Sequence, residues 1–522
     1  MNRSRTISSI LSTLVMLFFA VTPASADSKS DPWALRDHYK FSGDEVSFQV
    51  DPKRAEWRVV MDPADATVNP VYTEIELGDG TILRLSKSNW ITDGRDTFTD
   101  GFGSAIRFRS EFKPSDGLHV EYHLNRYNSQ AFMTIVLVLR NTQTKPISLR
   151  AIRMGVVEPG SLARIADAQL QLNRSTRRGM HVSLQDDGQV NLVSIRIDGA
   201  SNHFGLGLLQ SGFMRSSINL NRDHSSLDGN IESVFDPPID IQPGGTAQSD
   251  PLWFLLSIPD TESLRNAHVY TESFVLETPE EMTYPTAWMT TPFGMTSIDF
   301  LKIASEWKVR SIKHMLVPGG WQGKQVRVPI SMNALSKSLR YNGLIPGLTV
   351  DPLLAERSLP NVTVRAADGT HWINISSLDA RKEGVQKLRQ FVIWKYNFFV
   401  VSPTGMPDDV LRKLNVTRAV ADKVALELMQ TAAGKKPVMP SSGLTLGNDP
   451  AAWRRAAEAT ALNASYNIPT GSVTLDIRGV NELSLETNNA IKDFVGPIEI
   501  IGIPGKKVRQ QLLESRPLYA TP

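Results

Sequence analysis

Residues 314–322 read HMLVPGGWQ, an apolar stretch that ends at Pro318 and continues through two glycines to Trp321 and Gln322. The apolar part is typical of a buried strand, and glycines let the backbone after it pass close to a ligand. An indole offers a flat apolar face, and an amide offers both a hydrogen-bond donor and an acceptor. This combination suits the apolar and polar sides of a sugar ring, so we expect Trp321 and Gln322 to contact substrate.

From residue 285 to the end of the chain, stretches typical of helices and of buried strands alternate. Residues 297–308 carry apolar side chains at helical spacing and lead into the strand that ends at residue 317. Further strand candidates are LIPGLTV (344–350), HWINIS (371–376), FFVVS (398–402), KPVMPS (436–441), YNI (466–468), SVTLDI (472–477) and PIEIIGI (497–503). Helical patterns separate most of them, which is the order of βα units. The pattern predicts a (β/α)8 TIM-type barrel over residues 285–522.

The first half of the chain has a different period. Apolar and polar residues alternate in short runs such as EVSFQV (45–50), VYTEIEL (71–77) and PLWFLLSI (251–258). Turn signals such as LGDG (77–80) and QPGG (242–245) stand between such runs. This alternation predicts a large two-sheet β-sandwich over residues 27–275, followed by a connector that leads to the barrel.

The N-terminus has the features of an export signal. Arg3 and Arg5 precede an apolar run over residues 10–21, and Ala24-Ser25-Ala26 gives the small-x-small pattern of a cleavage site. We therefore predict a signal peptide over residues 1–26 and a secreted or periplasmic mature protein. An anchor that stays uncut is the alternative. No later stretch is apolar enough for a membrane span, so none is expected after cleavage.

Composition narrows the partners that the chain can have. It contains no cysteine, so neither a disulfide nor a lipid-modified cysteine can form, and stability has to come from an apolar core. Its 56 Lys and Arg residues nearly balance its 54 Asp and Glu residues, for a net charge of +2. Such a balance gives no reason to expect nucleic acid or an anionic membrane surface as partner. No residue spacing resembles a metal site, and no cofactor is expected.

The loops after the strands of such a barrel line one face, where active sites are found. This rule selects six further candidates: Asp351, Ser402, Asp449, Trp453, Asp476 and Arg478. Four of them have a structural alternative. Asp449 before Pro450 is an ordinary helix N-cap, Asp476 and Arg478 can form a salt bridge, and Asp351 before Pro352 is common turn chemistry. Trp321 can likewise be a packing residue at the rim.

In order and spacing, residues 200–522 resemble glycoside hydrolase family 36, the α-galactosidase and raffinose-synthase group. AWMTTPFG (287–294) and HMLVPGGWQ are similar to the family's Trp-containing opening segment and to its first strand ending in Asp-Asp-Gly-Trp-Gln. FFVVSPTG (398–405) stands where the family has Lys-x-Asp, and GLTLGNDPAAW (443–453) where it has Arg-x-x-x-Asp before a Trp. The segments GLIPGLTVDPLLA, HWINISSLDARKEGVQKL and HFGLGLLQSGF are similar to its second strand, its third strand and helix, and a strand of its sandwich.

The resemblance implies a degenerate catalytic site. Retaining glycosidases use two carboxyl groups about 5–5.5 Å apart, one as nucleophile and one as general acid. Asp449 matches the family's acid/base, whereas Ser402 stands at the nucleophile position. Other polar anchors of the family are also replaced, by Val400, Thr445, Pro318 and Gly319. We therefore expect that standard retaining hydrolysis is lost.

Three functions follow from this reading. The first is a secreted protein that binds or acts on an α-galactoside-like carbohydrate, with Asp449 as the retained catalytic acid. The second is an active glycosidase that pairs Asp449 with a relocated carboxylate, Asp351, Asp379 or Asp476. An inverting mechanism would place the two groups about 6.5–9.5 Å apart. The third is a non-catalytic structural or assembly protein of the cell envelope. The oligomeric state is open in all three.

Overall fold

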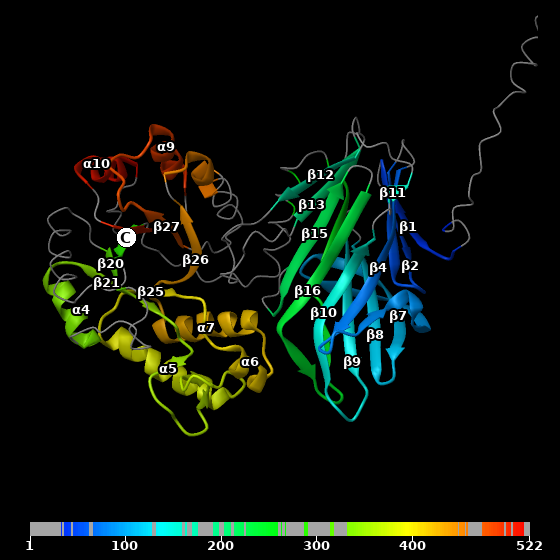
Figure 1. Cartoon of the computed structure of the whole chain (residues 1–522), viewed down its shortest axis with the longest axis horizontal. Coiled ribbons are helices and arrows are strands. Elements are labelled where there is room, and N and C mark those ends of the chain that lie inside the picture. Colours follow the sequence, from blue (N-terminus) through cyan, green and yellow to red (C-terminus); the bar gives the residue numbers. More distant parts are fainter. Residues whose placement is uncertain are drawn as a thin grey trace, which may run out of the picture. The chain divides into compact units, whose positions relative to one another are not determined.

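The structure is a computed structural model of the chain, and it describes most residues between 33 and 515. Residues 1–32, 176–191, 268–286, 291–313, 318–330, 458–471 and 516–522 lie outside the description, together with several shorter stretches. The signal peptide predicted over residues 1–26 therefore falls outside it. The described part forms two antiparallel sheets, a ring of parallel strands and a small third sheet (Figure 1).

The two antiparallel sheets are built from residues 39–258, where the sequence alternates. The first follows the order β1, β2, β3, β4, β10, β16, β15, with β5 and β11 on β4. Its strands are β1 (Tyr39–Ser42), β2 (Val46–Asp51), β3 (Glu56–Met61), β4 (Ala66–Leu77), β5 (Ile82–Arg84), β10 (Ile147–Val157), β11 (Leu162–Ala163), β15 (Arg215–Asp223) and β16 (Ser226–Ile241).

The second sheet follows the order β12, β13, β14, β18, β9, β8, β7, β6, with β17 on β9. Its strands are β6 (Asn89–Asp100), β7 (Gly103–Ser115), β8 (Leu118–Tyr127), β9 (Phe132–Asn141), β12 (Leu170–Ser175), β13 (Leu192–Ile197), β14 (His203–Leu208), β17 (Thr246–Gln248) and β18 (Leu252–Ile258).

Aromatic rings from both sheets meet in one core. The ring centroid of Phe48 in β2 lies 4.5 Å from that of Phe254 in β18, and Trp57 in β3 meets Phe254 edge-on at 5.4 Å. Phe48, Phe204 and Trp57 are at most 2% exposed. Alternating strands bury one face in this way, so the sheets pack face to face as the sequence pattern predicts.

The parallel strands close into a ring in the order β19, β20, β21, β25, β26, β27, β28. They are β19 (Ala287–Thr290), β20 (His314–Val317), β21 (Ile345–Val350), β25 (Phe398–Val401), β26 (Val438–Leu446), β27 (Ser472–Asp476) and β28 (Ile498–Ile501). The described helices are α4 (Met332–Tyr341), α5 (Leu378–Ile393), α6 (Asp408–Leu414), α7 (Arg418–Ala433), α9 (Leu485–Asp493) and α10 (Lys506–Ser515), with a 3-10 turn η1 (Leu85–Lys87) in the sandwich. Parallel strands that alternate with helices confirm the βα character expected of this half.

The prediction for residues 371–376 needs correction. Residues 371–376 were expected to form a barrel strand, but β24 (His371–Ile373) pairs antiparallel with β22 (Leu354–Ala355) and β23 (Thr363–Arg365) in a separate sheet. The turn at Gly369, with φ +85°, folds β24 back on β23, which fixes an antiparallel partner. The ring of described residues instead includes β19, which was not predicted as a strand. The candidate YNI lies outside the described residues, and the proposed domain limits 27–275 and 285–522 remain predictions.

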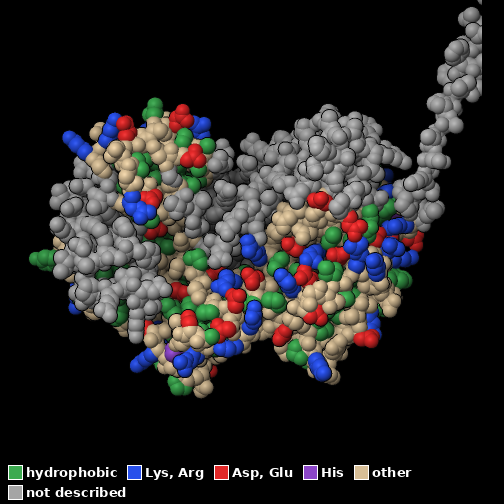
Figure 2. Space-filling view, in the orientation of Figure 1, with side chains coloured by type: hydrophobic (Ala, Val, Ile, Leu, Met, Phe, Trp, Pro, Cys, Tyr) green, Lys and Arg blue, Asp and Glu red, His purple; other side chains and the backbone are tan. Residues whose placement is uncertain are grey.

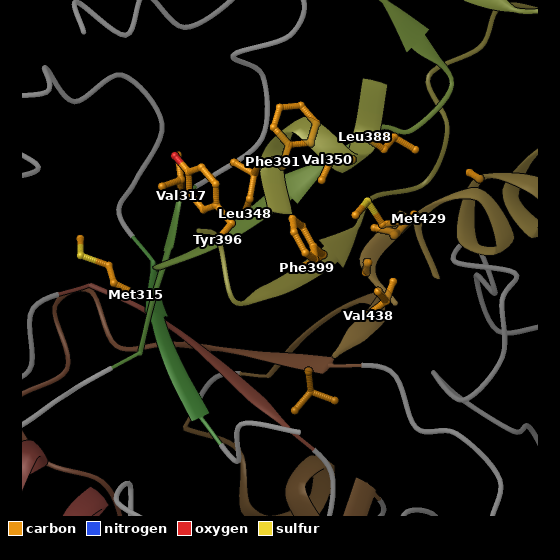
Figure 3. Packing of buried hydrophobic residues seen from close by; sticks show 14 of the residues in the cluster. Met315, Val317, Leu348, Val350, Leu388, Phe391, Tyr396, Phe399, Met429 and Val438 are labelled. Atoms are coloured by element: carbon orange, nitrogen blue, oxygen red, sulfur yellow. The ribbon is translucent and has the colours of Figure 1, made fainter. Parts of the chain in front are cut away.

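Alternate residues of the ring strands belong to two apolar clusters. Met315, Val317, Leu348 and Phe399 belong to a large cluster that also contains side chains of the helices (Figure 3). Their strand neighbours Leu316, Phe398, Val400 and Met439 form a smaller cluster. Because successive side chains of a strand point to opposite faces, the smaller cluster fills the inside of the ring.

Candidate functional site

Ser402 directly follows strand β25, at the end of the ring where function was expected. Its backbone N–H donates to the carbonyl oxygen of Val350 at 3.1 Å, and its hydroxyl donates to the same oxygen at 3.2 Å. The hydroxyl therefore faces the neighbouring strand β21 and has its proton engaged there. A serine acts as a nucleophile when a base takes this proton, and a backbone carbonyl cannot do so.

The loop after Ser402 is held by two carboxylates from different elements. Asp351, at the end of β21, accepts a hydrogen bond from the backbone N–H of Gly405 at 3.0 Å. Asp422, on the buried face of α7, accepts one from the N–H of Thr404 at 2.7 Å. The same two acids therefore fix two successive peptide groups of one loop. Asp351 and Ser402 thus both lie at the end of the ring where β21 and β25 finish.

Both acids are shifted toward their protonated forms. Burial raises the pKa of Asp351 to about 6, against the opposing effect of backbone N–H groups from Gly405, Leu353 and Leu354. Burial also raises the pKa of Asp422 to about 7, and the negative charge of Asp351 adds to this, while Thr404 N–H and Arg418 oppose it. Carboxyl groups with such pKa values can hold a proton near neutrality, as general acids do.

Asp449 caps a helix. Its side chain accepts a hydrogen bond from the N–H of Ala451 at 3.0 Å, and its carbonyl accepts one from the N–H of Trp453 at 3.2 Å. Helical residues begin at Pro450, and Asp449 itself is exposed. This is the N-cap alternative stated for the sequence. A catalytic role for Asp449 remains a proposal.

Trp453 is fully buried, at 0% exposure, and its ring meets Phe494 edge-on with centroids 5.6 Å apart. This position corrects the expectation that the indole contacts substrate, because a side chain enclosed by the core presents no face to a ligand. The Ala-rich helix after Asp449 explains the placement, since it needs one large apolar side chain to fill its contact with α9.

Asp476 and Arg478 form the salt bridge that was the alternative for this pair. The Nε of Arg478 lies 2.9 Å from Oδ1 and 3.1 Å from Oδ2 of Asp476. Hydrogen bonds from Arg478 lower the pKa of Asp476. The pair sits at the end of β27, with the arginine largely exposed. Two charges that satisfy each other can still orient a sugar hydroxyl, so ligand contact stays a proposal for both.

The remaining candidates are Trp321, Gln322 and Asp379. Trp321 and Gln322 lie outside the described residues, as do Pro318 and Gly319. Asp379, which the active-glycosidase alternative invoked, is exposed in the first turn of α5 and pairs with Lys382 at 3.5 Å. This surface ion pair gives Asp379 an ordinary structural role.

Sequence reasoning did not select two acids of the second half of the chain whose pKa values are raised. One is Asp422, described above. The other is Glu499 in β28, whose neighbours Ile498 and Ile500 point to the outer cluster, so Glu499 points into the ring. Burial raises the pKa of Glu499 to about 7. In both cases the sequence places an acid where the spacing of apolar residues predicts a buried side chain. This mismatch could have identified Asp422 and Glu499 as candidates.

The described residues contain no group of three His, Asp or Glu side chains that could hold a metal ion. Within the same residues, no helix has the length and apolar character needed to cross a bilayer. On the face shown in Figure 2, basic and acidic side chains are interspersed rather than gathered in a patch of one sign. This agrees with the balanced composition of the chain.

No known protein-family profile matches the sequence, and no curated protein matches it. Solved structures do. The galactosidase domain of the α-galactosidase-sucrose kinase AgaSK covers 92% of this chain with 84% of its own length, at 12% identity and a TM-score of 0.54. A second similar structure is a variant of AgaA, a glycoside hydrolase family 36 α-galactosidase from Geobacillus stearothermophilus, with bound raffinose. It covers 92% of this chain with 86% of its own length, at 10% identity and a TM-score of 0.53.

An α-galactosidase from Lactobacillus brevis is similar to the same extent, with 92% of this chain and 83% of its own covered, 12% identity and a TM-score of 0.53. At these identities the likeness shows the fold. The chain therefore has the fold of family 36 α-galactosidases, as the sequence resemblance implied, with a sandwich followed by a barrel-like α/β part.

Proposed function

We propose that the chain is a secreted or periplasmic protein that binds an α-galactoside-like carbohydrate at the strand ends of its ring and has lost standard retaining hydrolysis. Trp321, Gln322, Asp351, Ser402, Asp476 and Arg478 are its proposed ligand contacts, and Asp449 is the proposed acid in any chemistry that survives. Trp453 is left out because it is buried. The shared fold supports the substrate class, since one of the similar α-galactosidases has raffinose bound.

The observation that carries this proposal is the position of Ser402. A retaining glycosidase needs a carboxylate that attacks the anomeric carbon and forms a covalent intermediate. Ser402 has a hydroxyl instead, and that hydroxyl donates to Val350. Two acids at this loop, Asp351 and Asp422, accept backbone hydrogen bonds that fix its shape. A shaped loop with a serine in place of the carboxylate nucleophile is suited to binding.

Calorimetry with raffinose, beside a chromogenic α-galactoside assay, tests the proposal. We expect raffinose binding without turnover, and Trp321→Ala should weaken binding by about 1–3 kcal/mol, the range for loss of an aromatic contact. Unchanged affinity in Trp321→Ala would remove that residue from the site. Absence of binding by the wild-type chain would favour the structural or assembly role in the envelope.

One observation favours the second candidate, an active glycosidase with relocated carboxylates. Asp351 has a pKa of about 6, which suits a general acid, and it lies beside the Ser402 loop. Measurable α-galactoside hydrolysis that Asp351→Asn abolishes, while raffinose affinity is kept, would establish this function. If neither Asp351→Asn nor Asp449→Asn changes the rate of hydrolysis, neither residue acts as the catalytic acid.

A further inference from the structure

The β-sandwich contains a cavity of about 290 Å³ on the face of its second sheet that points away from the sandwich core. The face is fixed by β18: Phe254 contacts Phe48 across the core, so its neighbour Trp253 points to the opposite side. Thr134 of β9 is the cross-strand partner of Trp253 and shares that side. Thr134 lines the cavity, which is bounded by strands β6, β7, β8 and β9.

On the polar side of the cavity, hydrogen-bonded side chains from three neighbouring strands form a row. Arg107 in β7 donates from Nε to Oδ1 of Asn125 in β8 at 3.2 Å, and Asn125 donates from Nδ2 to the hydroxyl of Thr134 in β9 at 3.0 Å. Asn125 is 5% exposed and Thr134 is 2% exposed. Polar groups this deep in a sheet face are held in fixed directions, and the guanidinium keeps further N–H donors for a ligand.

A carboxylate lines the same cavity. Asp100, at the end of β6, accepts a hydrogen bond from the Tyr127 hydroxyl at 2.7 Å and one from the Phe102 N–H at 2.9 Å. Its oxygens still have lone pairs available, because a carboxylate accepts about four hydrogen bonds. The cavity therefore offers an oriented acceptor at one point and oriented donors at another.

The apolar side of the cavity consists of aromatic rings. Tyr127 meets Phe102 edge-on at 5.6 Å and Phe98 at 6.2 Å between centroids. The guanidinium carbon of Arg107 lies 4.3 Å from the centre of the Phe98 ring, which holds the cation against this wall. Rings of this kind pack against the C–H face of a ligand.

The charges of the lining are balanced. Asp100 and Arg107 carry opposite charges, and burial lowers the pKa of His123, whose ring is hydrogen-bonded to Glu121 at 2.7 Å. A neutral histidine leaves no excess positive charge that would select an anion. A small neutral ligand with several hydroxyl groups and one apolar face matches this arrangement, and a volume near 300 Å³ is at the lower end for small-molecule pockets.

We propose that this cavity binds a single neutral sugar ring and is a second saccharide site, located in the sandwich. The apolar face of the sugar packs on Phe102, Asp100 accepts hydrogen bonds from its hydroxyl groups, and Arg107 donates to their oxygens. The site does not depend on the strand-end site of the ring, so either proposal can fail without the other.

The test is saturation-transfer NMR with methyl α-D-galactoside and methyl α-D-glucoside on the full chain carrying Trp321→Ala, which weakens the proposed ring site. We expect transfer from at least one sugar, and Asp100→Asn should weaken that sugar's binding about tenfold, the scale of one charged hydrogen bond. Asp93→Asn, an exposed acid of the same strand that does not line the cavity, should leave binding unchanged.

Gln248→Ala gives a second variant, because Gln248 is an exposed lining residue whose truncation spares the fold. It should also weaken binding, with an unchanged melting temperature. Absence of transfer from both sugars overturns the proposal. Equal binding by the Trp321→Ala chain and by the same chain carrying Asp100→Asn or Gln248→Ala also overturns it. Binding of inorganic phosphate without binding of either sugar would show an anion site and would also overturn the proposal.

Discussion

Asp351 and Asp422 accept hydrogen bonds from consecutive backbone N–H groups, those of Gly405 and Thr404, so two acids from separate elements hold one loop. This loop follows β25, where the family 36 resemblance puts the catalytic nucleophile. Holding successive peptide groups fixes the direction in which the loop leaves the strand. In this chain, the acids at the end of the ring shape a surface, and they do so while buried enough to have raised pKa values.

Removing one of these acceptors should destabilise the protein. Asp422→Ala leaves the N–H of Thr404, a residue 3% exposed, without its acceptor, and an unsatisfied buried donor costs about 1–3 kcal/mol. Urea unfolding of the variant should show a loss of this size. Glu427→Ala, an exposed position of the same helix, is the matched control and should change stability by less than about 0.5 kcal/mol. Equal losses in the two variants would contradict the role of Asp422.

The raised pKa values also predict how stability depends on pH. Asp351 and Asp422 have folded pKa values of about 6 and 7, above the ordinary 3.8, so between pH 4 and 7 the folded state binds more protons than the unfolded state. Their contribution to stability is therefore fully present below pH 4 and is lost as pH rises through 6 to 7.

Denaturation midpoints measured from pH 4 to 8 check this sign. Asp422→Asn cannot titrate and keeps an acceptor oxygen, so the difference in unfolding free energy between variant and wild type should shift in favour of the variant as pH rises. A pH-independent difference would mean that Asp422 titrates like an exposed aspartate.

Two substitutions of Asp449 distinguish its role as a helix N-cap from a role as a catalytic acid. Asp449→Ala removes the hydrogen bond from Ala451 and should cost about 0.5–2 kcal/mol, the range for loss of an N-cap. Asp449→Asn keeps a capping oxygen and should unfold like the wild type. If hydrolysis is lost as proposed, a chromogenic α-galactoside should turn over at the same background rate in the wild type and in Asp449→Asn. A slower rate in Asp449→Asn alone would show that Asp449 still acts as an acid.

The sequence predicted the strands well and their partners less well. Alternation in residues 39–258 is enough to predict a sandwich, because a half-buried antiparallel strand repeats every two residues. HWINIS has the same apolar signature whether it joins a parallel ring or a local hairpin sheet, so its burial pattern could not reveal that β24 pairs with β22 and β23. Strand partners depend on contacts between segments that are distant in sequence, and one strand's pattern does not contain them.

The same limit applies to the candidate site. The strand-end rule found Asp351 and Ser402, which the structure brings to one loop, because the rule uses the geometry shared by all such barrels. It could not find Asp422, which reaches that loop from a helix. It also selected Trp453, since a tryptophan after a strand looks the same in sequence whether it faces the core or a ligand. Burial decides between the two, and here it is complete.

The last prediction concerns Gly347, in the interior of the ring. A Cβ atom at this position of β21 would overlap the ring of Phe398, its cross-strand neighbour in β25 and part of the inner cluster. Gly347→Ala should therefore destabilise the protein by about 1–3 kcal/mol, the usual cost of overpacking a core. Phe398→Leu frees space at the same place, so the double variant should lose less than the two single losses added together.

Gly384 in helix α5 supplies a control of opposite sign. A Cβ there would meet its neighbours at ordinary contact distances of 3.7–3.9 Å, and alanine is favoured over glycine inside a helix by about 0.5–1 kcal/mol. Gly384→Ala should thus raise the urea midpoint while Gly347→Ala lowers it. If both substitutions stabilise the protein, Phe398 does not fill the inside of the ring at Gly347.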